Sequence, residues 1–195
     1  MTKPANRIRV IGGKWRGSRI SVADLPGLRP TGDRVRETLF NWLMADIAGA
    51  RCLDAFSGSG VLGFEALSRG AREVLAFESA ATAANAIRDT ISRLGADAFH
   101  LQQQSFFVEH GYAGEPFDIV FIDPPFAQDL HTMALDYLIQ NKLLAEHALV
   151  YLEMPAGQTP QGFAEHWHIK KSKTAGAVWF ALLQYVASAS EQGNL

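Results

Sequence analysis

Apolar runs and helically spaced stretches alternate along the middle of the chain. Short apolar runs at residues 52–56, 73–77, 98–101, 117–122 and 148–153 are typical of buried strands. Helical spacing is found between several of them, at residues 61–68, 80–94 and 130–141. Strands that alternate with helices imply a parallel sheet with right-handed crossovers. The pattern therefore predicts an α/β fold.

Both ends of the chain depart from this alternation. Residues 7–11 and 18–22 alternate basic and apolar side chains around a glycine-rich centre, which predicts a β-hairpin with one basic face. Near the other end, residues 163–171 and 177–186 are interpreted as two strands joined by residues 172–176. This closing hairpin would add an antiparallel strand to the sheet.

A further helix is predicted over residues 34–46, before the first central strand. Val35, Leu39, Leu43 and Ile47 recur at a spacing of four, as on one buried helix face. The first turn also holds two arginines, although positive charge at this end opposes the helix dipole. Such a local conflict indicates a functional role for the segment. We expect a basic hairpin extension over 1–28, a main domain over 29–186 and a flexible tail over 187–195.

Composition narrows the possible classes of protein. The 195 residues are 48% hydrophobic, which suits one sizeable domain. A single cysteine, Cys52, leaves no internal disulfide and fits a reducing, cytoplasmic location; its apolar surroundings favour a buried core position. No apolar stretch is long enough to span a bilayer, and the first residues do not form a signal peptide. The sequence offers no metal-binding cluster.

Charge is spread unevenly along the chain. Residues 1–36 hold nine of the 18 Lys and Arg but only two acids, so this segment carries +7 and the rest −9. Such asymmetry favours a polyanion, and specifically nucleic acid, as partner. The residues expected to contact it are Arg7, Arg9, Lys14, Trp15, Arg16 and Arg19. Trp15 at the hairpin tip either stacks on a base or covers the apolar face of the hairpin, and the sequence leaves both interpretations open.

A glycine turn follows the first central strand. Asp54 and Phe56 lie in this strand, and Gly58 and Gly60 follow before the predicted helix at 61–68. Such a turn lets a ligand approach the backbone, whose helix N-terminal amides would face it. Asp54 would repel a pyrophosphate but could meet a cation such as an amino-acid ammonium. A nucleotide-like cofactor is the natural occupant of such a strand end.

Acidic residues end two further strands of the predicted sheet. Glu78 follows Gly58 by twenty residues, at a position where an acid can accept both hydroxyls of a ribose. Asp123, Pro124, Pro125 and Phe126 form the most specific motif, because two prolines fix a pair of oxygen acceptors beside a stacking ring. Such acceptors can hold the hydrogens of an exocyclic base amine while its nitrogen attacks an electrophilic methyl group.

These motifs together match one known family. The chain resembles the bacterial 16S ribosomal RNA (guanine-N2)-methyltransferases of the RsmD family, which methylate guanine 966 in the standard rRNA numbering. The resemblance covers nearly the whole chain, from the hairpin at 7–22 through residues 29–41 to the glycine turn, Glu78 and the Asp-Pro-Pro-Phe motif. Its specific part is the Arg-Pro-Thr segment at 29–31 combined with the Phe-x-Gly-x-Gly turn.

The resemblance implies S-adenosylmethionine as methyl donor and a Rossmann-like, seven-stranded, mainly parallel sheet. It places Asp54, Phe56, Gly58, Gly60 and Glu78 at the donor, with Thr31 and Arg34 approaching from the N-terminal side. Asp123, Pro124 and Phe126 would handle the target base. Family members often carry Asp or Asn after the third strand of the sheet to bind the adenine amine; here only Gln104 or Ser105 can serve. The expected partner is 16S rRNA within the small subunit or a late assembly particle, bound by a monomer.

Three alternatives remain open on the sequence. An N6-adenine methyltransferase acting on RNA or DNA would use the same Asp-Pro-Pro-Phe motif, although no separate target-recognition domain is evident. An NAD-dependent dehydrogenase would explain the glycine spacing but would have no use for that motif. A non-catalytic RNA-binding protein with a relict donor site would not need Gly58, Gly60, Glu78 and Asp123 intact.

Overall fold

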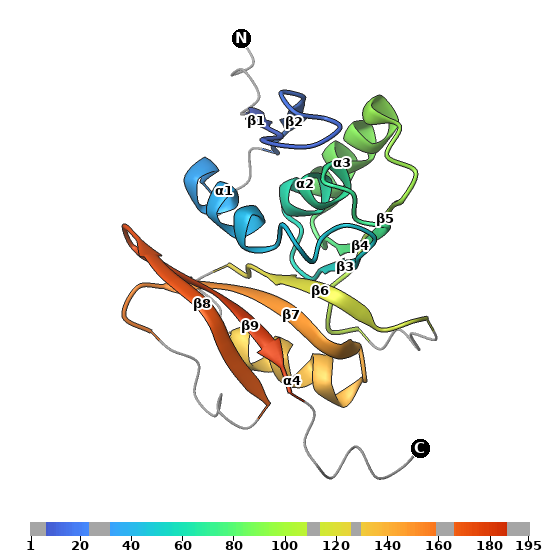
Figure 1. Ribbon diagram of the computed structural model, residues 1–195. Helices are drawn as coiled ribbons and strands as arrows, with labels where there is room; N and C mark the ends of the chain where they lie inside the picture. The colour runs from blue at the N-terminus through green and yellow to red at the C-terminus, as the bar shows by residue number, and fades with distance from the viewer. Residues whose placement is uncertain (1–6, 24–31, 109–113, 126–129, 159–165, 187–195) are drawn as a thin grey trace.

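A seven-stranded sheet forms the centre of the protein (Figure 1). The computed structural model describes residues 7–23, 32–108, 114–125, 130–158 and 166–186. Its strand order is β5-β4-β3-β6-β7-β9-β8; β5 to β7 run parallel, whereas β9 is antiparallel to both β7 and β8. The strands are β3 (Arg51–Asp54), β4 (Glu73–Phe77), β5 (Phe99–Gln102), β6 (Phe117–Ile122), β7 (Leu144–Pro155), β8 (Trp167–Ala175) and β9 (Val178–Tyr185). The predicted fold class is confirmed.

Helices cover both faces of this sheet (Figure 1). On one face lie α1 (Asp33–Trp42), α2 (Val61–Ser68) and α3 (Ala81–Leu94), and on the other lies α4 (His131–Gln140). Strand alternation divides the core accordingly. Phe121 of β6 belongs to the cluster that includes α1 and α2, whereas its neighbour Ile122 belongs to the cluster that includes α4. Side chains on one strand therefore face different helices in turn.

The predicted N-terminal hairpin is present and packs against the helices. Its strands β1 (Arg7–Arg9) and β2 (Arg19–Ser21) pair antiparallel, with Ile8 opposite Ile20. Ile20 of β2 and Val10, which follows β1, are buried in the same cluster as α1 and α2. Burial of these apolar side chains holds the hairpin against the main body. The predicted boundary at 28 and the tail at 187–195 lie outside the described residues.

Several predicted boundaries are wrong. The strand predicted at 148–153 is the longer β7, and the strand predicted at 52–56 ends at Asp54. The connection between β8 and β9 is the two-residue turn 176–177, not residues 172–176, because the Ser-Lys-Thr stretch pairs with β9 as an exposed edge strand. Lysine-rich polar strands are common at sheet edges. Helix α1 ends at Trp42 rather than Asp46; residues 43–46 form turns that keep Leu43 and Ile47 buried.

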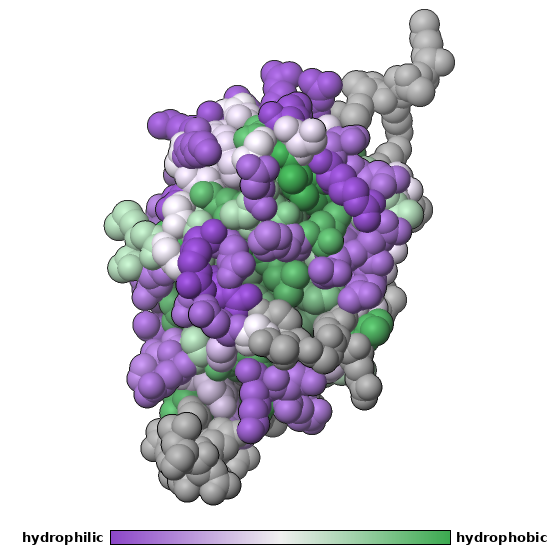
Figure 2. Space-filling view, turned by 90° about the vertical axis from the view of Figure 1, so that its right-hand side faces the viewer, coloured by the Kyte–Doolittle hydropathy of each residue, from purple (hydrophilic) through white to green (hydrophobic). Residues whose placement is uncertain are grey.

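The surface is mixed in character. Figure 2 shows the side that lies to the right in Figure 1, where hydrophilic residues surround a smaller area of hydrophobic ones. Much of any protein surface is apolar, so this area alone identifies no site. Within the described part of the chain, no helix is both long and apolar enough to cross a membrane.

Candidate active site at the carboxyl edge of the sheet

The turn between β3 and α2 has the geometry that its glycines predict. Gly58 and Gly60 adopt φ values of 53° and 73°, in the left-handed region that side chains disfavour. Gly60 is the N-cap of α2, and the amide of Ser57 donates to the carbonyl of Phe77 on β4 at 2.9 Å. A third glycine, Gly63, lets α2 pack closely, because a Cβ there would lie 2.6 Å from the ring of Phe99. The turn thus brings backbone amides to the sheet edge.

Asp54 ends β3 directly below this turn, with Ala76 on one side and Phe121 on the other. The carboxyl group is buried, and its Oδ2 has no hydrogen-bond partner among the described residues. Burial is the main cause that raises the pKa of Asp54 to about 7. A buried acid with an unused oxygen suits a cationic or amine-bearing ligand, as the sequence predicted.

Glu78 follows β4 and ties the turn to the next helix. Its Oε2 accepts the amide hydrogen of Gly58 at 2.8 Å, and its Oε1 accepts that of Ala80 at 2.7 Å, at the start of α3. Each carboxylate oxygen retains a second lone pair for a ligand hydroxyl. The half-buried Glu78 therefore supports the glycine turn and can also accept ribose hydroxyls.

Gln104 and Ser105 follow β5 at the same edge. The amide of Glu78 donates to the carbonyl of Gln102 at 3.1 Å, which joins the ends of β4 and β5. Ser105 is exposed and Gln104 half-buried. Phe56 is half-buried, and its ring centroid lies 6.1 Å from that of Phe106. The predicted donor residues after β3, β4 and β5 therefore share one edge.

Asp123 and Pro124 follow β6, on the other side of β3. Asp123 is half-buried, Pro124 is buried and Pro125 is exposed. Strand order reverses between β3 and β6, and ligands of doubly wound sheets bind at such switch points. The predicted donor residues and the Asp-Pro motif thus lie on either side of this switch point. Of the other predicted site residues, Arg34 is exposed on α1, whereas Thr31 and Phe126 lie outside the described residues.

The predicted nucleic-acid face is exposed on the hairpin. The side chains of Arg7, Arg9, Lys14, Arg16 and Arg19 are exposed. Trp15 is half-buried and packs against the main core cluster, with Lys14 Nζ 5.4 Å from its ring. Its packing favours the covering role of the two that the sequence left open.

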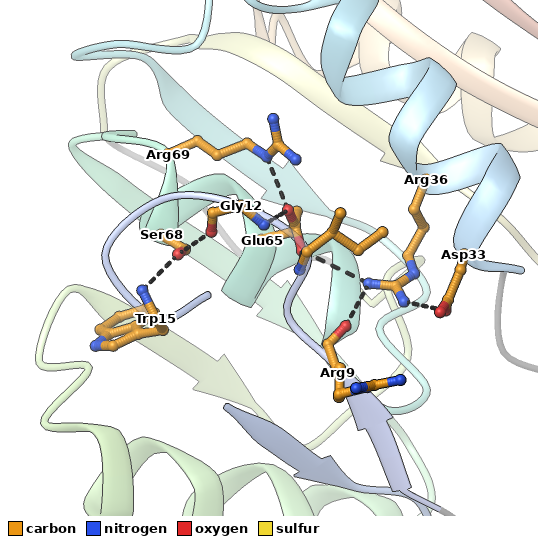
Figure 3. A network of polar contacts seen from close by, with 9 residues as sticks. Arg9, Gly12, Trp15, Asp33, Arg36, Glu65, Ser68 and Arg69 are labelled. Carbon is orange, nitrogen blue, oxygen red and sulfur yellow. Dashed lines mark hydrogen bonds and ion pairs between the residues drawn. The ribbon is translucent and has the colours of Figure 1, made fainter. Parts of the chain in front are cut away.

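Sequence reasoning missed the buried network that holds this hairpin in place (Figure 3). Glu65 of α2 accepts the amide hydrogens of Ile11 and Gly12, each at 2.8 Å. Its carboxylate also pairs with Arg69 at 2.8 Å and with Arg36 at 3.6 Å. The charge conflict noted in the first turn of α1 thus has a structural basis, because Arg36 is buried against Glu65. The sequence feature that could have revealed this network is Glu65, a single acid within an otherwise apolar helix.

A second missed pair lies on β7, next to the Asp-Pro motif. The hydroxyl of Tyr151 donates to Glu153 Oε2 at 2.6 Å, and both side chains are buried. An acid near the end of a strand was again the available signal, as for Glu78. Burial raises the pKa of the Cys52 thiol, in agreement with its predicted core position. No group of potential metal ligands is found among the described residues.

Comparison with known proteins gives a consistent result. Residues 8–184 match the family described as Conserved hypothetical protein 95. The chain is 43% identical to ribosomal RNA small subunit methyltransferase D of Haemophilus influenzae, over 91% of this chain and 93% of that protein. Identity to the protein of the same name from Escherichia coli is 38%, over the whole length of both. The solved structure of Escherichia coli yhhF, named as a methyltransferase, superimposes with a TM-score of 0.85 at 38% identity, covering 94% of this chain and 100% of that one.

Proposed function

Because the chain belongs to the family of ribosomal RNA small subunit methyltransferase D, we propose that it methylates the exocyclic N2 amine of a guanine in 16S rRNA. The proposed position is guanine 966 in the standard numbering. The observation that carries the proposal is the placement of the Asp123–Pro124 acceptor pair across the switch point from the glycine turn. That arrangement suits transfer between a bound donor and a base amine.

S-adenosylmethionine is the cofactor in this proposal, and the residues present fit it. The unused, buried Oδ2 of Asp54 suits the ammonium group, and Glu78 retains lone pairs for the ribose hydroxyls. The backbone at Gly58 and Gly60 would approach the methionine half, and Gln104 or Ser105 would bind the adenine amine. Phe56 and the partly described N-terminal segment with Thr31 and Arg34 would complete the donor side. When bound, this donor supplies an electrophilic methyl group.

On the acceptor side, the chain's own residues orient and activate the base. A guanine amine is a weak nucleophile, because its lone pair is delocalised into the ring. The Asp123 carboxylate and the Pro124 carbonyl would accept its two hydrogens and so stabilise the positive charge that grows as nitrogen attacks. When nitrogen takes the methyl group from a bound donor, the amine must lose one proton, and Asp123 would accept it. Phe126 would stack on the base.

The substrate is proposed to be 16S rRNA within the small subunit or a late assembly particle, reached by a cytoplasmic monomer. The exposed basic face of the hairpin supports an RNA partner, since phosphate contacts supply most of non-specific affinity. The same acceptor pair, Asp123 and the Pro124 carbonyl, would also suit methylation of the N6 amine of adenine. An N6-adenine methyltransferase is therefore the second candidate.

The deciding experiment is methyl transfer to small-subunit particles from a strain that lacks this activity. The particles are incubated with the protein and labelled S-adenosylmethionine, and the RNA is then digested to nucleosides. N2-methylguanosine at one position is expected. N6-methyladenosine would instead support the second candidate, and an absence of any methylated nucleoside would contradict both.

A further inference from the structure

Strand β8 carries positive charge that neither the candidate site nor the hairpin uses. Residues 166–175 contain Lys170, Lys171 and Lys173 and no acid, although the chain beyond residue 36 has a net charge of −9. All three lysines are exposed, and none of their side chains forms a hydrogen bond or ion pair within the described part of the chain. Their charges are therefore available to an external anion.

The arginines in the same part of the chain differ from these lysines, because they already have partners within the protein. Arg51, Arg69 and Arg72 each pair with a glutamate. Arg88 and Arg93 donate side-chain hydrogen bonds to neighbouring groups. Strand β8 thus stands out in an acidic region as a place where positive charge is concentrated and unpaired.

The direction of β8 places its carboxyl end at the edge of the sheet that holds the candidate site. Since β9 is antiparallel to both β7 and β8, β8 runs parallel to β7 and β6. Lys173 pairs with Phe180 of β9, which pairs with Glu153 of β7. Asp123 follows the last residue of β6, whose partner on β7 directly precedes Glu153. The backbones of Lys173 and Asp123 therefore lie in one row, three strand spacings or about 14 Å apart.

Register also identifies the face of the sheet to which two of the lysines belong. Lys171 and Lys173 lie opposite Leu182 and Phe180, which are buried in the cluster on the side of α1 and α2. Side chains of directly opposed residues share a face of the sheet. Trp42 of α1 stacks on Phe180 with a centroid distance of 5.3 Å, so α1 lies over this end of the sheet (Figure 1). Lys171 and Lys173 thus form one basic surface beside α1.

Lysines on an edge strand can also serve to prevent pairing with another sheet. That role requires only charge along the strand. It does not account for a surface of one sign, without internal partners, in the same row as Asp123. Such a surface is complementary to a polyanion that reaches the candidate site.

We propose that Lys171 and Lys173 bind phosphates of the rRNA close to the target base. The inference rests on the proposed function, because it takes the substrate to be RNA, and it adds a second contact surface to that of the hairpin. A helical nucleic-acid strand carries one phosphate per about 3.4 Å of its axis, so RNA that presents a base at Asp123 has several phosphates within about 14 Å. Phosphate contacts fix the register and orientation of a nucleic acid without reading its sequence. The lysines of β8 would therefore orient the RNA at the site.

The test measures binding of the full chain to small-subunit particles at several salt concentrations. Lys171→Gln/Lys173→Gln should lower the magnitude of the salt slope by about 1–2 and weaken binding about threefold to tenfold, because two phosphate contacts are lost. Lys142→Glu is the matched control. It changes the net charge equally, but Lys142 is exposed just before β7 begins, at the opposite edge of the sheet. Lys171→Arg/Lys173→Arg keeps both charges and should keep the slope.

Each outcome separates the inference from the function on which it rests. An unchanged salt slope in the glutamine variant would overturn the proposal and leave β8 only a protected edge. An equal loss in Lys142→Glu would also overturn it, since net charge alone would explain the effect. If the glutamine variant aggregates, the two single changes decide, each with about half of the expected slope change. If the unmodified protein forms no N2-methylguanosine, the proposed function fails, whereas the salt slopes still decide whether β8 contacts RNA.

Discussion

Arg36 Nη1 lies 3.6 Å from Glu65 Oε2, and neither side chain is exposed to solvent. The two residues join α1 to α2, and the hairpin is held through the same carboxylate. Arg36 also donates to the carbonyl of Arg9 at 3.1 Å and to Asp33 at 2.6 Å. A single buried acid therefore links the hairpin, α1 and α2, and the consequences of removing it can be measured.

Replacing Glu65 by Ala should destabilise the protein severely. Arg36 would lose its buried anionic partner while still in contact with the exposed Asp33 and the Arg9 carbonyl, and breaking a buried pair costs about 3–5 kcal/mol. Denaturant unfolding would give the free energy of unfolding. The matched control is Glu115→Ala, which removes an exposed pair with Arg72 and should leave the midpoint nearly unchanged. Similar midpoints for the two variants would contradict a structural role for Glu65.

Glu78→Ala should weaken donor binding by about 1–3 kcal/mol, the usual cost of leaving donors without an acceptor. Two effects add, since the ribose would lose its acceptor and the amide of Gly58 would lose the partner that fixes the turn. Calorimetry with S-adenosylhomocysteine measures this directly. Unchanged affinity in a folded variant would exclude Glu78 from the donor site.

Asp54 should make donor affinity depend on pH. Its pKa is raised to about 7, so below that pH the free protein carries the neutral acid, which must lose a proton before it can pair with an ammonium group. Affinity should therefore fall as pH decreases below about 7, approaching tenfold per pH unit, and should level off just above it. Calorimetry from about pH 5.5 to about pH 7.5, a range that brackets this pKa, would show how affinity changes with pH. In Asp54→Asn the slope should disappear; if it persists, another group is responsible.

Asp123→Ala should still bind the donor but lose turnover by about a hundredfold or more, the usual scale for one preorganised electrostatic partner. Asp54 and Glu78 remain in this variant, so donor binding is its internal control. Single-turnover methylation of small-subunit particles provides the rate. A rate near that of the unmodified protein would exclude the proposed acceptor role, whichever base is methylated.

Reversing the charges of Arg7 and Arg16 should weaken particle binding and flatten its salt dependence, because fewer counterions are released. Both side chains are exposed, and donor affinity should hardly change. Lys142→Glu, an exposed change beyond the end of α4, is the control for net charge. Equal salt slopes for the hairpin variant and the unmodified protein would mean that the hairpin face only contacts solvent.

The periodic parts of the chain could be predicted closely. Helix α2 was predicted with its exact limits, and the end residues of β3, β4 and β6 were placed at one edge because parallel strands share a direction. Glycine spacing located the turn, since only glycine adopts its φ values without strain. Local pattern was sufficient to predict structure wherever a single physical requirement explained the residue type at a position.

Contacts between distant segments could not be predicted in this way. Arg36 resembles any arginine in an exposed helix turn until Glu65, 29 positions later, is known to lie beside it. Likewise, the place of the Tyr151–Glu153 pair beside β6 follows only from the register of β7 against β6. The turn between β8 and β9 was misplaced because the lysines of an edge strand look like a loop when no pairing partner is known.

The anchoring of the hairpin also affects the order in which the chain folds during its synthesis. Ile11, Gly12 and Trp15 find their partners 53 or 54 residues later, on α2. At roughly 5–20 residues per second, several seconds pass between synthesis of the hairpin and synthesis of its anchor. Until then the amides of Ile11 and Gly12 have no buried carboxylate to bind, so the hairpin can dock only after α2 has left the ribosome.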